Sequence, residues 1–510
     1  MKKILLVVSL FIACVSISQA QRIDRSKFVK DSLEYYINRA MTNWRIPGAA
    51  VCIVKDNKII LLKGYGIKEL GMNNKVDINT LFMIGSNTKA FTATALAMLQ
   101  TQNKLSLDDK VTKYLPQFKL ENKPAGEMAV IRDLLCHRLG FQTFQGDFTF
   151  YNTNLSRNDI IERLGQEKAA YPFRTKWGYT NAAFLTAGQI IPVVTGKPWE
   201  VYLKENIFSP LGMTNTLALT ADIPKSLNKT VPYTLIDGRL SAIPYCQIDG
   251  LAPAGAISSS VNDLSKWVLA LLNDGKVGAR QVIPADAVKA TREPQDIVGS
   301  IHHLDGENNF ELYGLGWFIQ DYAGHRLVMH DGGVNGYLTS VTLVPQEHLG
   351  IIVLTNTDQN NFFDALRWEI MDAYFKMPYR NYSEVYLANF KANATINDAA
   401  DKRLRDTVAL SHPAAVPLSA YTGKYVNDLY GSMTCVQGEN NVLEIRFEHH
   451  TRMYARLQAL GGNRFYVTFS DPVLGKAVFP FTVQNGKVTG VKVKVADFVE
   501  YNPYDFRKVE

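Results

Sequence analysis

The chain has 510 residues, of which 46% are hydrophobic and 20% charged, and its formal net charge is +7. This composition excludes a disordered, collagen-like or repeat-dominated chain, and the length exceeds what one hydrophobic core supports, so we expect two or three domains. Because basic and acidic residues alternate along the chain, the mild positive charge does not indicate nucleic-acid binding.

The first twenty residues resemble a secretory signal peptide. Lys2 and Lys3 precede an apolar run over residues 4–17, and small residues follow up to Ala20. A basic start, a short apolar core and small residues at the cleavage point are typical of such signals, and the run is too short to span a bilayer. We therefore expect export to the bacterial periplasm. A lipoprotein modified at Cys14, extracellular release and a buried N-terminal element are the alternatives.

Cleavage would leave four cysteines that are far apart in the sequence: Cys52, Cys136, Cys246 and Cys435. They form no CxxC pair and have no metal-type spacing, and the histidine pairs at 302–303 and 449–450 lack an HExxH context. We expect buried or free thiols, with a disulfide framework as the alternative. The sequence predicts neither a metal nor a cofactor.

A large first domain is predicted over residues 21–380. Residues 48–63 form two β-rich runs around an Asp56-Asn57 turn, which indicates a hairpin, and residues 88–99 are apolar on nearly every side, as in a buried central helix. Further helices are predicted at 159–165, 182–194 and 362–375, and strands at 326–329, 337–344 and 350–355. Strands at both ends with helices between them imply an α/β domain whose sheet is assembled from distant parts of the chain.

A second, smaller domain is predicted over residues 412–510, after a polar and partly helical connecting segment at 381–411. Short alternating runs occur here, and the Asn485-Gly486 dipeptide is a strong hairpin signal. About eight such runs suggest a small antiparallel barrel or sandwich. Since it carries no chemical motif, we expect it to shield or shape the site of the first domain.

The first candidate site is residues 85–89 (GSNTK), at the start of the apolar helix. At helical spacing Ser86 and Lys89 share a face, so the ammonium can approach the hydroxyl. The helix N-terminus supplies free N–H groups where an oxyanion would form, and Lys89 in a dry pocket could lose its proton and act as a base. A cap on a core helix is the structural alternative, and Ser226 and Lys229 have the same spacing.

Residues 177–181 (WGYTN) contain the second candidate site. A Tyr179 kept anionic by neighbouring cations could take a proton from serine, and Asn181 could bind a substrate amide. A core aromatic with a bonded hydroxyl is the alternative for Tyr179.

Residues 330–333 (HDGG) contain the third candidate site, between two predicted strands. Glycines at a strand edge let a substrate backbone lie close, and the Gly333 N–H could complete an oxyanion hole.

In combination, Ser-x-x-Lys, Tyr-x-Asn and His-x-Gly in this order resemble the serine β-lactamase-like family. This family includes class C β-lactamases, D-alanyl-D-alanine carboxypeptidases, D-aminopeptidases and related esterases. The resemblance covers roughly residues 30–380 and extends to the segments at 64–66, 82–89, 105–109, 253–258 and 313–317. It implies a β-lactamase/transpeptidase-like α/β domain, with an antiparallel sheet flanked by helices and a helical subdomain, followed by a small lipocalin-like barrel.

The resemblance also implies roles for the motif residues. Ser86 would be the nucleophile that forms an acyl ester, with Lys89 and Tyr179 sharing the work of the general base. The N–H groups of Ser86 and Gly333 would form the oxyanion hole. Substrate-binding roles are implied for Asn181, His330, Gly332 and Gly333.

Two departures from the family pattern bear on the substrate. His330 stands where β-lactamases and many carboxypeptidases have lysine, so a permanent cation is replaced by a group often neutral at pH 7. Asp331 stands where a hydroxyl residue usually helps to bind a carboxylate, and it would repel one unless it is paired or points away. Both argue against efficient hydrolysis of β-lactams or of peptides with a free C-terminus.

The leading hypothesis is an exported serine hydrolase acting on peptides that contain D-amino acids, or on related amides. An esterase of the same family is the first alternative and a β-lactamase the second. A protein of a different class, a non-catalytic penicillin-binding or sensing protein, is also open. The expected partner is a small peptide, amide or ester, with no nucleic acid and no membrane-spanning segment once the signal is removed. The oligomeric state is left open.

Overall fold

A computed structural model describes residues 27–299, 309–439 and 442–509. The predicted signal peptide and the histidine pair at 302–303 lie outside the described residues. Within the described ranges, none of the helices combines the length and the apolar character needed to cross a membrane.

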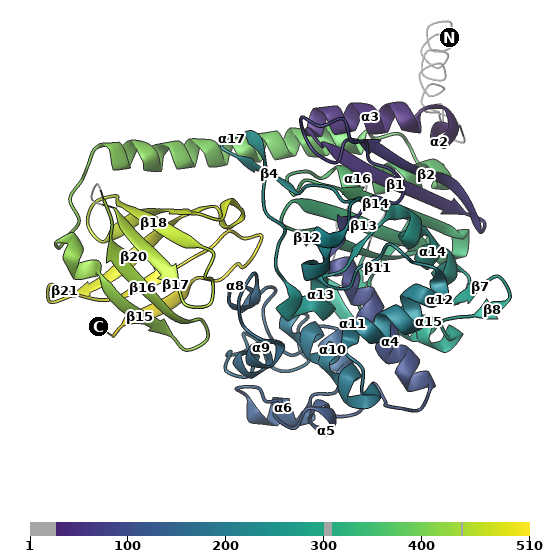
Figure 1. Ribbon diagram of the computed structural model, residues 1–510, viewed down its shortest axis with the longest axis horizontal. Coiled ribbons are helices and arrows are strands. Elements are labelled where there is room, and N and C mark those ends of the chain that lie inside the picture. The colour runs from purple at the N-terminus through teal and green to yellow at the C-terminus, as the bar shows by residue number, and fades with distance from the viewer. Residues whose placement is uncertain (1–26, 300–308, 440–441, 510) are drawn as a thin grey trace, which may run out of the picture.

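The first part of the chain is built on an eight-stranded antiparallel sheet in the order β2-β1-β14-β13-β12-β11-β10-β9 (Figure 1). The predicted hairpin forms β1 (Gly48–Lys55) and β2 (Lys58–Gly66), and Asp56 and Asn57 turn between them with φ of 51° and 62°. The next strand beside β1 is β14 (Leu349–Thr355), so the sheet joins distant parts of the chain, as predicted. The other strands are β13 (Tyr337–Val344), β12 (His325–Val334), β11 (Phe318–Tyr322), β10 (Glu311–Tyr313) and β9 (Asp296–Gly299).

Helices cover both faces of this sheet (Figure 1). On β1, Ala49, Val51 and Ile53 pack in one core with α3 (Leu33–Trp44) and α16 (Phe362–Phe375). The alternate residues of the same strand belong to a second core, which includes the central helix α4 (Thr88–Thr101) and helix α14 (Val261–Leu272). Because successive side chains of a strand point to opposite faces, a strand buried on both sides is apolar throughout, as β1 is.

The central helix predicted at 88–99 is α4 (Thr88–Thr101), and every residue from 88 to 99 is buried. The other helices before the connecting segment are α2 (Phe28–Asp31), α5 (Val111–Tyr114), α6 (Lys123–Met128), α7 (Ile131–Leu135), α8 (Asp147–Phe150), α9 (Arg157–Leu164), α10 (Asn181–Thr195), α11 (Trp199–Leu203), α12 (Ser209–Leu211), α13 (Ala252–Gly255), α14 (Val261–Leu272) and α15 (Ala285–Thr291). Small strand pairs join β3 (Phe82–Met83) to β6 (Ser258–Ser259), β4 (Tyr233–Ile236) to β5 (Arg239–Ala242), and β7 (Lys276–Val277) to β8 (Arg280–Gln281).

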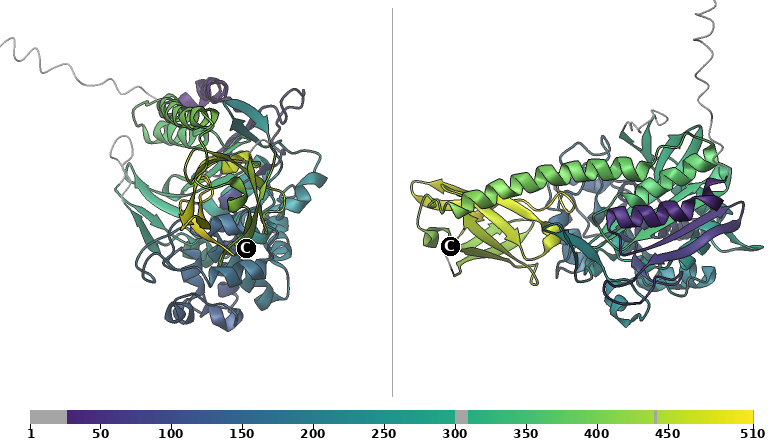
Figure 2. Two further views of the ribbon diagram at one scale, coloured as in Figure 1. Left: turned by 90° about the vertical axis from the view of Figure 1, so that its left-hand side faces the viewer. Right: turned by 90° about the horizontal axis from the view of Figure 1, so that it is seen from above.

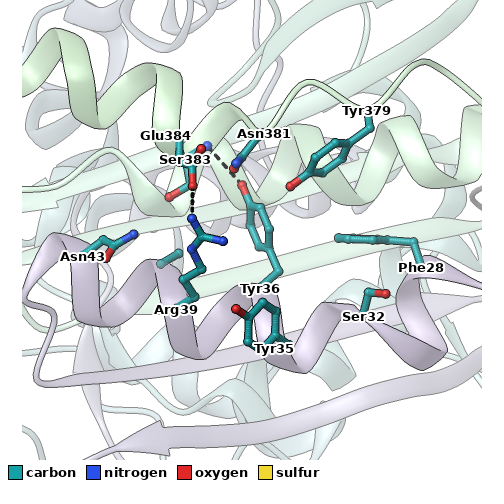
Figure 3. Close-up of a pocket in the computed structure, with 11 residues that line it drawn as sticks. Phe28, Ser32, Tyr35, Tyr36, Arg39, Asn43, Tyr379, Asn381, Ser383 and Glu384 are labelled. Carbon is teal, nitrogen blue, oxygen red and sulfur yellow. Dashed lines mark hydrogen bonds and ion pairs between the residues drawn. The ribbon is translucent and has the colours of Figure 1, made fainter.

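The connecting segment is more regular than predicted, because α17 (Tyr382–Ala409) is one helix of 28 residues that spans nearly all of it. It runs from the first domain to the barrel (Figure 2). Its first turn is fixed to α3, since the Ser383 N–H donates to the Tyr36 hydroxyl at 3.1 Å and Arg39 pairs with Glu384 at 2.5 Å. Figure 3 shows this joint and its pocket of about 230 Å³, which contains none of the predicted site residues.

The C-terminal part is a closed eight-stranded antiparallel barrel, which confirms the barrel expected from the sequence. Aromatic side chains fill its interior: the Tyr421, Phe465 and Phe481 rings lie 4.9 to 5.2 Å apart. The Asn485-Gly486 turn joins two of the strands, as predicted. The strands are β15 (Gly423–Asn427), β16 (Gly431–Gln437), β17 (Leu443–Phe447), β18 (Tyr454–Ala459), β19 (Arg464–Phe469), β20 (Lys476–Gln484), β21 (Lys487–Val493) and β22 (Tyr504–Lys508).

Candidate active site

Ser86 lies in a short 3₁₀ turn, η1 (Gly85–Asn87), that leads directly into α4. Two contacts hold this turn against the sheet. The Asn87 side chain donates to Thr339 Oγ1 of β13 at 3.0 Å, and Thr339 Oγ1 donates to the Ile84 carbonyl at 3.1 Å. The turn leaves Ser86 partly exposed while the residues on either side of it are buried. The serine therefore sits at an accessible helix N-terminus, as the sequence predicted.

Lys89 is completely buried and its Nζ is surrounded by three oxygen atoms. Nζ lies 3.1 Å from Ser86 Oγ, 2.7 Å from Asn181 Oδ1 and 2.8 Å from the Ala254 carbonyl oxygen. A neutral amine has two N–H bonds and one lone pair. Asn181 and Ala254 accept the two N–H bonds, which leaves the lone pair directed toward the Ser86 hydroxyl.

The surroundings of Lys89 favour that neutral form. Burial lowers the pKa of Lys89 to about 7, against the smaller opposing effect of the Asp147 carboxylate. Near pH 7 a large fraction of the side chain is then unprotonated, which is the state that can take a proton from serine. The sequence predicted the approach of Lys89 to Ser86, and the burial of Lys89 in three dimensions favours the neutral amine.

Tyr179 lies beside the same two residues. Lys89 Nζ is 4.5 Å from the centre of the Tyr179 ring. Burial raises the pKa of Tyr179 well above its usual value, and a hydrogen bond with Ser86 opposes this shift to a smaller extent. Of the two possibilities that the sequence left open for Tyr179, the anionic form is therefore disfavoured in the resting site.

Asp147, which the sequence did not single out, orients Asn181. The Asn181 Nδ2 donates to Asp147 Oδ2 at 2.6 Å, which turns the Oδ1 end of the amide toward Lys89. No motif surrounds Asp147, and it begins the short helix α8, 34 residues before Asn181, so no sequence signal could have identified it. Asn181 thus accepts a hydrogen bond from Lys89, in addition to any contact with a substrate.

The edge of β12 approaches the serine turn closely at two glycines. A Cβ on Gly332 would lie 1.9 Å from the Ile84 carbonyl oxygen, and a Cβ on Gly85 would lie 2.9 Å from both the N and the O of Gly333. Gly85 also has a φ of +50°, which side chains disfavour. These contacts bring the Gly333 backbone next to Ser86, where its N–H can assist in an oxyanion hole.

His330 lies on this strand but is buried, with both ring nitrogens engaged. Its Nδ1–H donates to the Asp331 carbonyl at 2.6 Å, and its Nε2 lies 3.0 Å from the Tyr313 hydroxyl. Burial, and then the charge of Lys89, lower the pKa of His330 to about 3. His330 is therefore a neutral part of the site wall at pH 7, consistent with the expected loss of a permanent cation.

The Asp331 side chain is paired with Arg367, which is one of the two conditions under which it would not repel a substrate carboxylate. The Arg367 Nη1 of α16 lies 2.7 Å from Asp331 Oδ1 and 3.1 Å from Ser340 Oγ, and Arg367 also pairs with Asp364. Arg367 is only 3% exposed. Its charge is thus engaged with carboxylates of its own domain.

The barrel contributes two aromatic side chains near the site. Phe498 packs over Gly333, since a Cβ there would lie 3.5 Å from its ring. The Tyr501 ring lies 5.4 Å from that of Phe144, which in turn lies 5.6 Å from the Tyr179 ring. Both residues belong to the segment between β21 and β22, so the barrel helps to shape this site.

The described part of the chain shows no cluster of three or more His, Cys, Asp or Glu side chains that could hold a metal ion. The cysteines Cys52, Cys136, Cys246 and Cys435 are buried free thiols, as expected.

Two family models match the chain. The model described as Beta-lactamase matches residues 33–375, and a domain of unknown function, DUF3471, matches residues 409–508. The first match includes all the predicted site residues, and the second includes the barrel.

Among curated proteins, the chain is similar to the unguisins hydrolase ungD′ of Aspergillus campestris, with 27% identity over 432 residues, 80% of this chain and 78% of that protein. Its fold is similar to the octameric penicillin-binding protein homologue from Pyrococcus abyssi, with a TM-score of 0.59 and 21% identity over 93% of this chain and 99% of that one. It is also similar to a D-stereospecific amidohydrolase from Streptomyces sp., with a TM-score of 0.52 and 20% identity over 64% of this chain and 94% of that one.

Proposed function

This chain belongs to the beta-lactamase family and is a serine hydrolase, and from that premise we propose that Ser86 is its nucleophile and Lys89 its general base. The observation that carries the proposal is the position of Lys89 Nζ, 3.1 Å from Ser86 Oγ, with both N–H bonds of the neutral amine already accepted by other groups. Tyr179, protonated and in contact with Ser86, is proposed to relay a proton to the leaving group.

The proposed reaction is acyl transfer through a serine ester. Ser86 Oγ attacks the carbonyl carbon of the substrate and its proton passes to Lys89 Nζ. The N–H groups of Ser86 and Gly333 stabilise the oxyanion, a contribution of roughly 10²–10³-fold per donor. The C–N bond then breaks, the amine leaves with a proton from the Lys89–Tyr179 pair, and water hydrolyses the ester to release the acid and restore Ser86.

The proposed substrates are peptides that contain D-amino acids, or related amides. The β12 edge supports this choice because His330 is neutral and the Arg367 charge is engaged by Asp331 and Asp364, so this edge offers no free cation to a substrate carboxylate. An amide carbonyl needs no such cation. The names of two similar proteins, a hydrolase of unguisins and a D-stereospecific amidohydrolase, also suggest this class.

We also propose that the protein is exported to the periplasm, on the strength of residues 1–20 alone. Mass measurement of the protein recovered from a periplasmic fraction should show a mature chain that begins after Ala20. Recovery of the full-length chain from the cytoplasm would contradict export.

The substrate proposal is tested with matched amides of D- and L-amino acids, a p-nitrophenyl ester and a penicillin, each with the wild type and with Ser86→Ala. We expect the D-amides to be hydrolysed faster than the L-amides, and their hydrolysis to fall at least about 10³-fold in Ser86→Ala. Turnover of the ester alone would replace the amidase by an esterase, and efficient penicillin hydrolysis would replace it by a β-lactamase. Equal amide hydrolysis by Ser86→Ala would refute the nucleophile.

A further inference from the structure

A barrel carboxylate, Glu500, reaches into the first domain next to the active site. Glu500 is fully buried in the segment between β21 and β22. Its side chain accepts the backbone N–H of Gly146 at 2.8 Å and of Phe148 at 3.0 Å. These two residues are the immediate neighbours of Asp147. A single side chain of the barrel therefore fixes the backbone on both sides of the aspartate that orients the site.

From Asp147 the contacts continue to the catalytic pair. Asp147 Oδ2 accepts from Asn181 Nδ2 at 2.6 Å, and Asn181 Oδ1 accepts from Lys89 at 2.7 Å. Asp147 is 4% exposed, and among the described residues its Oδ1 has no hydrogen-bond partner. A buried carboxylate with one unsatisfied oxygen carries a high desolvation cost when it is ionised, so burial favours the protonated form of Asp147.

We propose that Glu500 is a positioning residue of the active site, which controls through Asp147 and Asn181 whether Lys89 is available as a base. This inference rests on the proposed function, since it concerns the proposed base. It extends that function because a residue of the barrel would influence the protonation state of Lys89.

The charge of Glu500 acts on Lys89 through Asp147. Burial, and then the nearby Glu500 charge, raise the pKa of Asp147 to about 8, and burial raises the pKa of Glu500 to about 7. Burial and an anionic Glu500 together favour protonated Asp147, and a neutral Asp147 gives no support to a Lys89 ammonium. Loss of the Glu500 charge would lower the pKa of Asp147 and favour its ionisation, and the Asp147 anion would then raise the pKa of Lys89.

Other titratable groups of the described chain also surround these contacts. At the barrel end, Glu500 accepts hydrogen bonds from the Tyr430 hydroxyl, at 2.6 Å, and from the Tyr504 hydroxyl. Burial raises the pKa values of both tyrosines. Lys494 donates to the main-chain oxygen of Glu500 and to the side chain of Asp497. Four buried side chains near the path are held neutral by pKa shifts: His137, Tyr179, His330 and His450. Two further carboxyl groups act on the tyrosines of the path: Glu167, which bonds Gln145 and whose pKa is raised by burial, acts on Tyr504, and Asp331, which is paired with Arg367, acts on Tyr179.

The test measures the rate of Ser86 modification by a neutral fluorophosphonate from pH 5 to 10 in the full chain. Glu500→Gln keeps an acceptor oxygen but removes the charge, and Asp147→Asn makes the neutral state of this position permanent. We expect the pH midpoint of modification to rise by about one unit in Glu500→Gln and to stay at the wild-type value in Asp147→Asn, because Asp147 is already neutral there in the wild type. Glu444→Gln is the matched control, because this barrel carboxylate pairs with the exposed Arg446, and its midpoint should equal that of the wild type.

A raised midpoint in Glu500→Gln distinguishes the proposal from a purely structural role, which would lower the rate at every pH without moving the midpoint. An unmoved midpoint in Glu500→Gln, or a raised midpoint in Asp147→Asn as well, would overturn the inference and leave the proposed function intact. Absence of modification in the wild type would overturn both. Thermal unfolding of each variant checks folding. If Glu500→Gln does not fold, Tyr430→Phe replaces it. Loss of the hydrogen bond from the Tyr430 hydroxyl favours the neutral form of Glu500, so the pH midpoint of Tyr430→Phe should also rise. An unmoved midpoint in this variant would refute the proposal.

Discussion

Gly85→Ala tests whether the close contact between the serine turn and the edge of β12 is needed for activity. The new Cβ would lie 2.9 Å from the N and O of Gly333, whereas ordinary contact begins at 3.4 Å, so the two segments must separate by about half an ångström. A displacement of 1 Å in an active site can cost about 10²-fold, so we expect kcat/KM to fall between about 10-fold and 10²-fold.

The control for this variant is Gly196→Ala, which isolates the cost of the backbone conformation. Gly196 also has a positive φ, of +71°, but a Cβ there would have no atom within 4 Å. Both variants should lose about 1–2 kcal/mol of stability from the left-handed backbone. The assay is kcat/KM on the best amide substrate, beside urea unfolding of both variants. Activity of Gly85→Ala within about threefold of Gly196→Ala would refute the argument that this contact positions the oxyanion hole.

Three further predictions follow from the charges of the site. The rate of Ser86 modification by a neutral reagent should rise about fivefold from pH 6 to 7 and less than twofold from pH 7 to 8, because Lys89, with a pKa of about 7, loses its proton over this range. A tenfold rise in this rate per pH unit up to pH 9 would contradict the prediction. His330→Gln should leave the pH midpoint of this reaction unchanged between pH 5 and 8, since His330 is already neutral there, and a shifted midpoint would show that it carries charge. Arg367→Met should destabilise the protein by about 1–3 kcal/mol in urea unfolding, because it leaves Asp331 and Asp364 unpaired; unchanged stability would refute this role.

Sequence reasoning succeeded where the chemistry is local. Ser86 and Lys89 are one helical turn apart, so their approach follows from helix geometry once an apolar helix is recognised after them. The hairpin at residues 48–63 and the turn at Asn485 are local in the same way, since two residues fix each turn.

The remainder depends on contacts between distant parts of the chain. Glu500 lies more than 350 positions from Gly146 and Phe148, and no periodicity or spacing relates them. The charge states of Tyr179 and His330 also depend on burial, which is why the sequence left both an anionic Tyr179 and a core aromatic open, while the burial of Tyr179 favours its neutral form. A residue type gives the ordinary pKa, but only the surrounding structure gives its shift.

The central claim is that Ser86 is an activated nucleophile. Intact-mass analysis after incubation with a fluorophosphonate, for the wild type and for Ser86→Ala, tests it most directly. We predict one adduct on the wild type, mapped to the peptide that contains Ser86, and none on Ser86→Ala. An unmodified wild type, or an adduct that persists in Ser86→Ala, would contradict it.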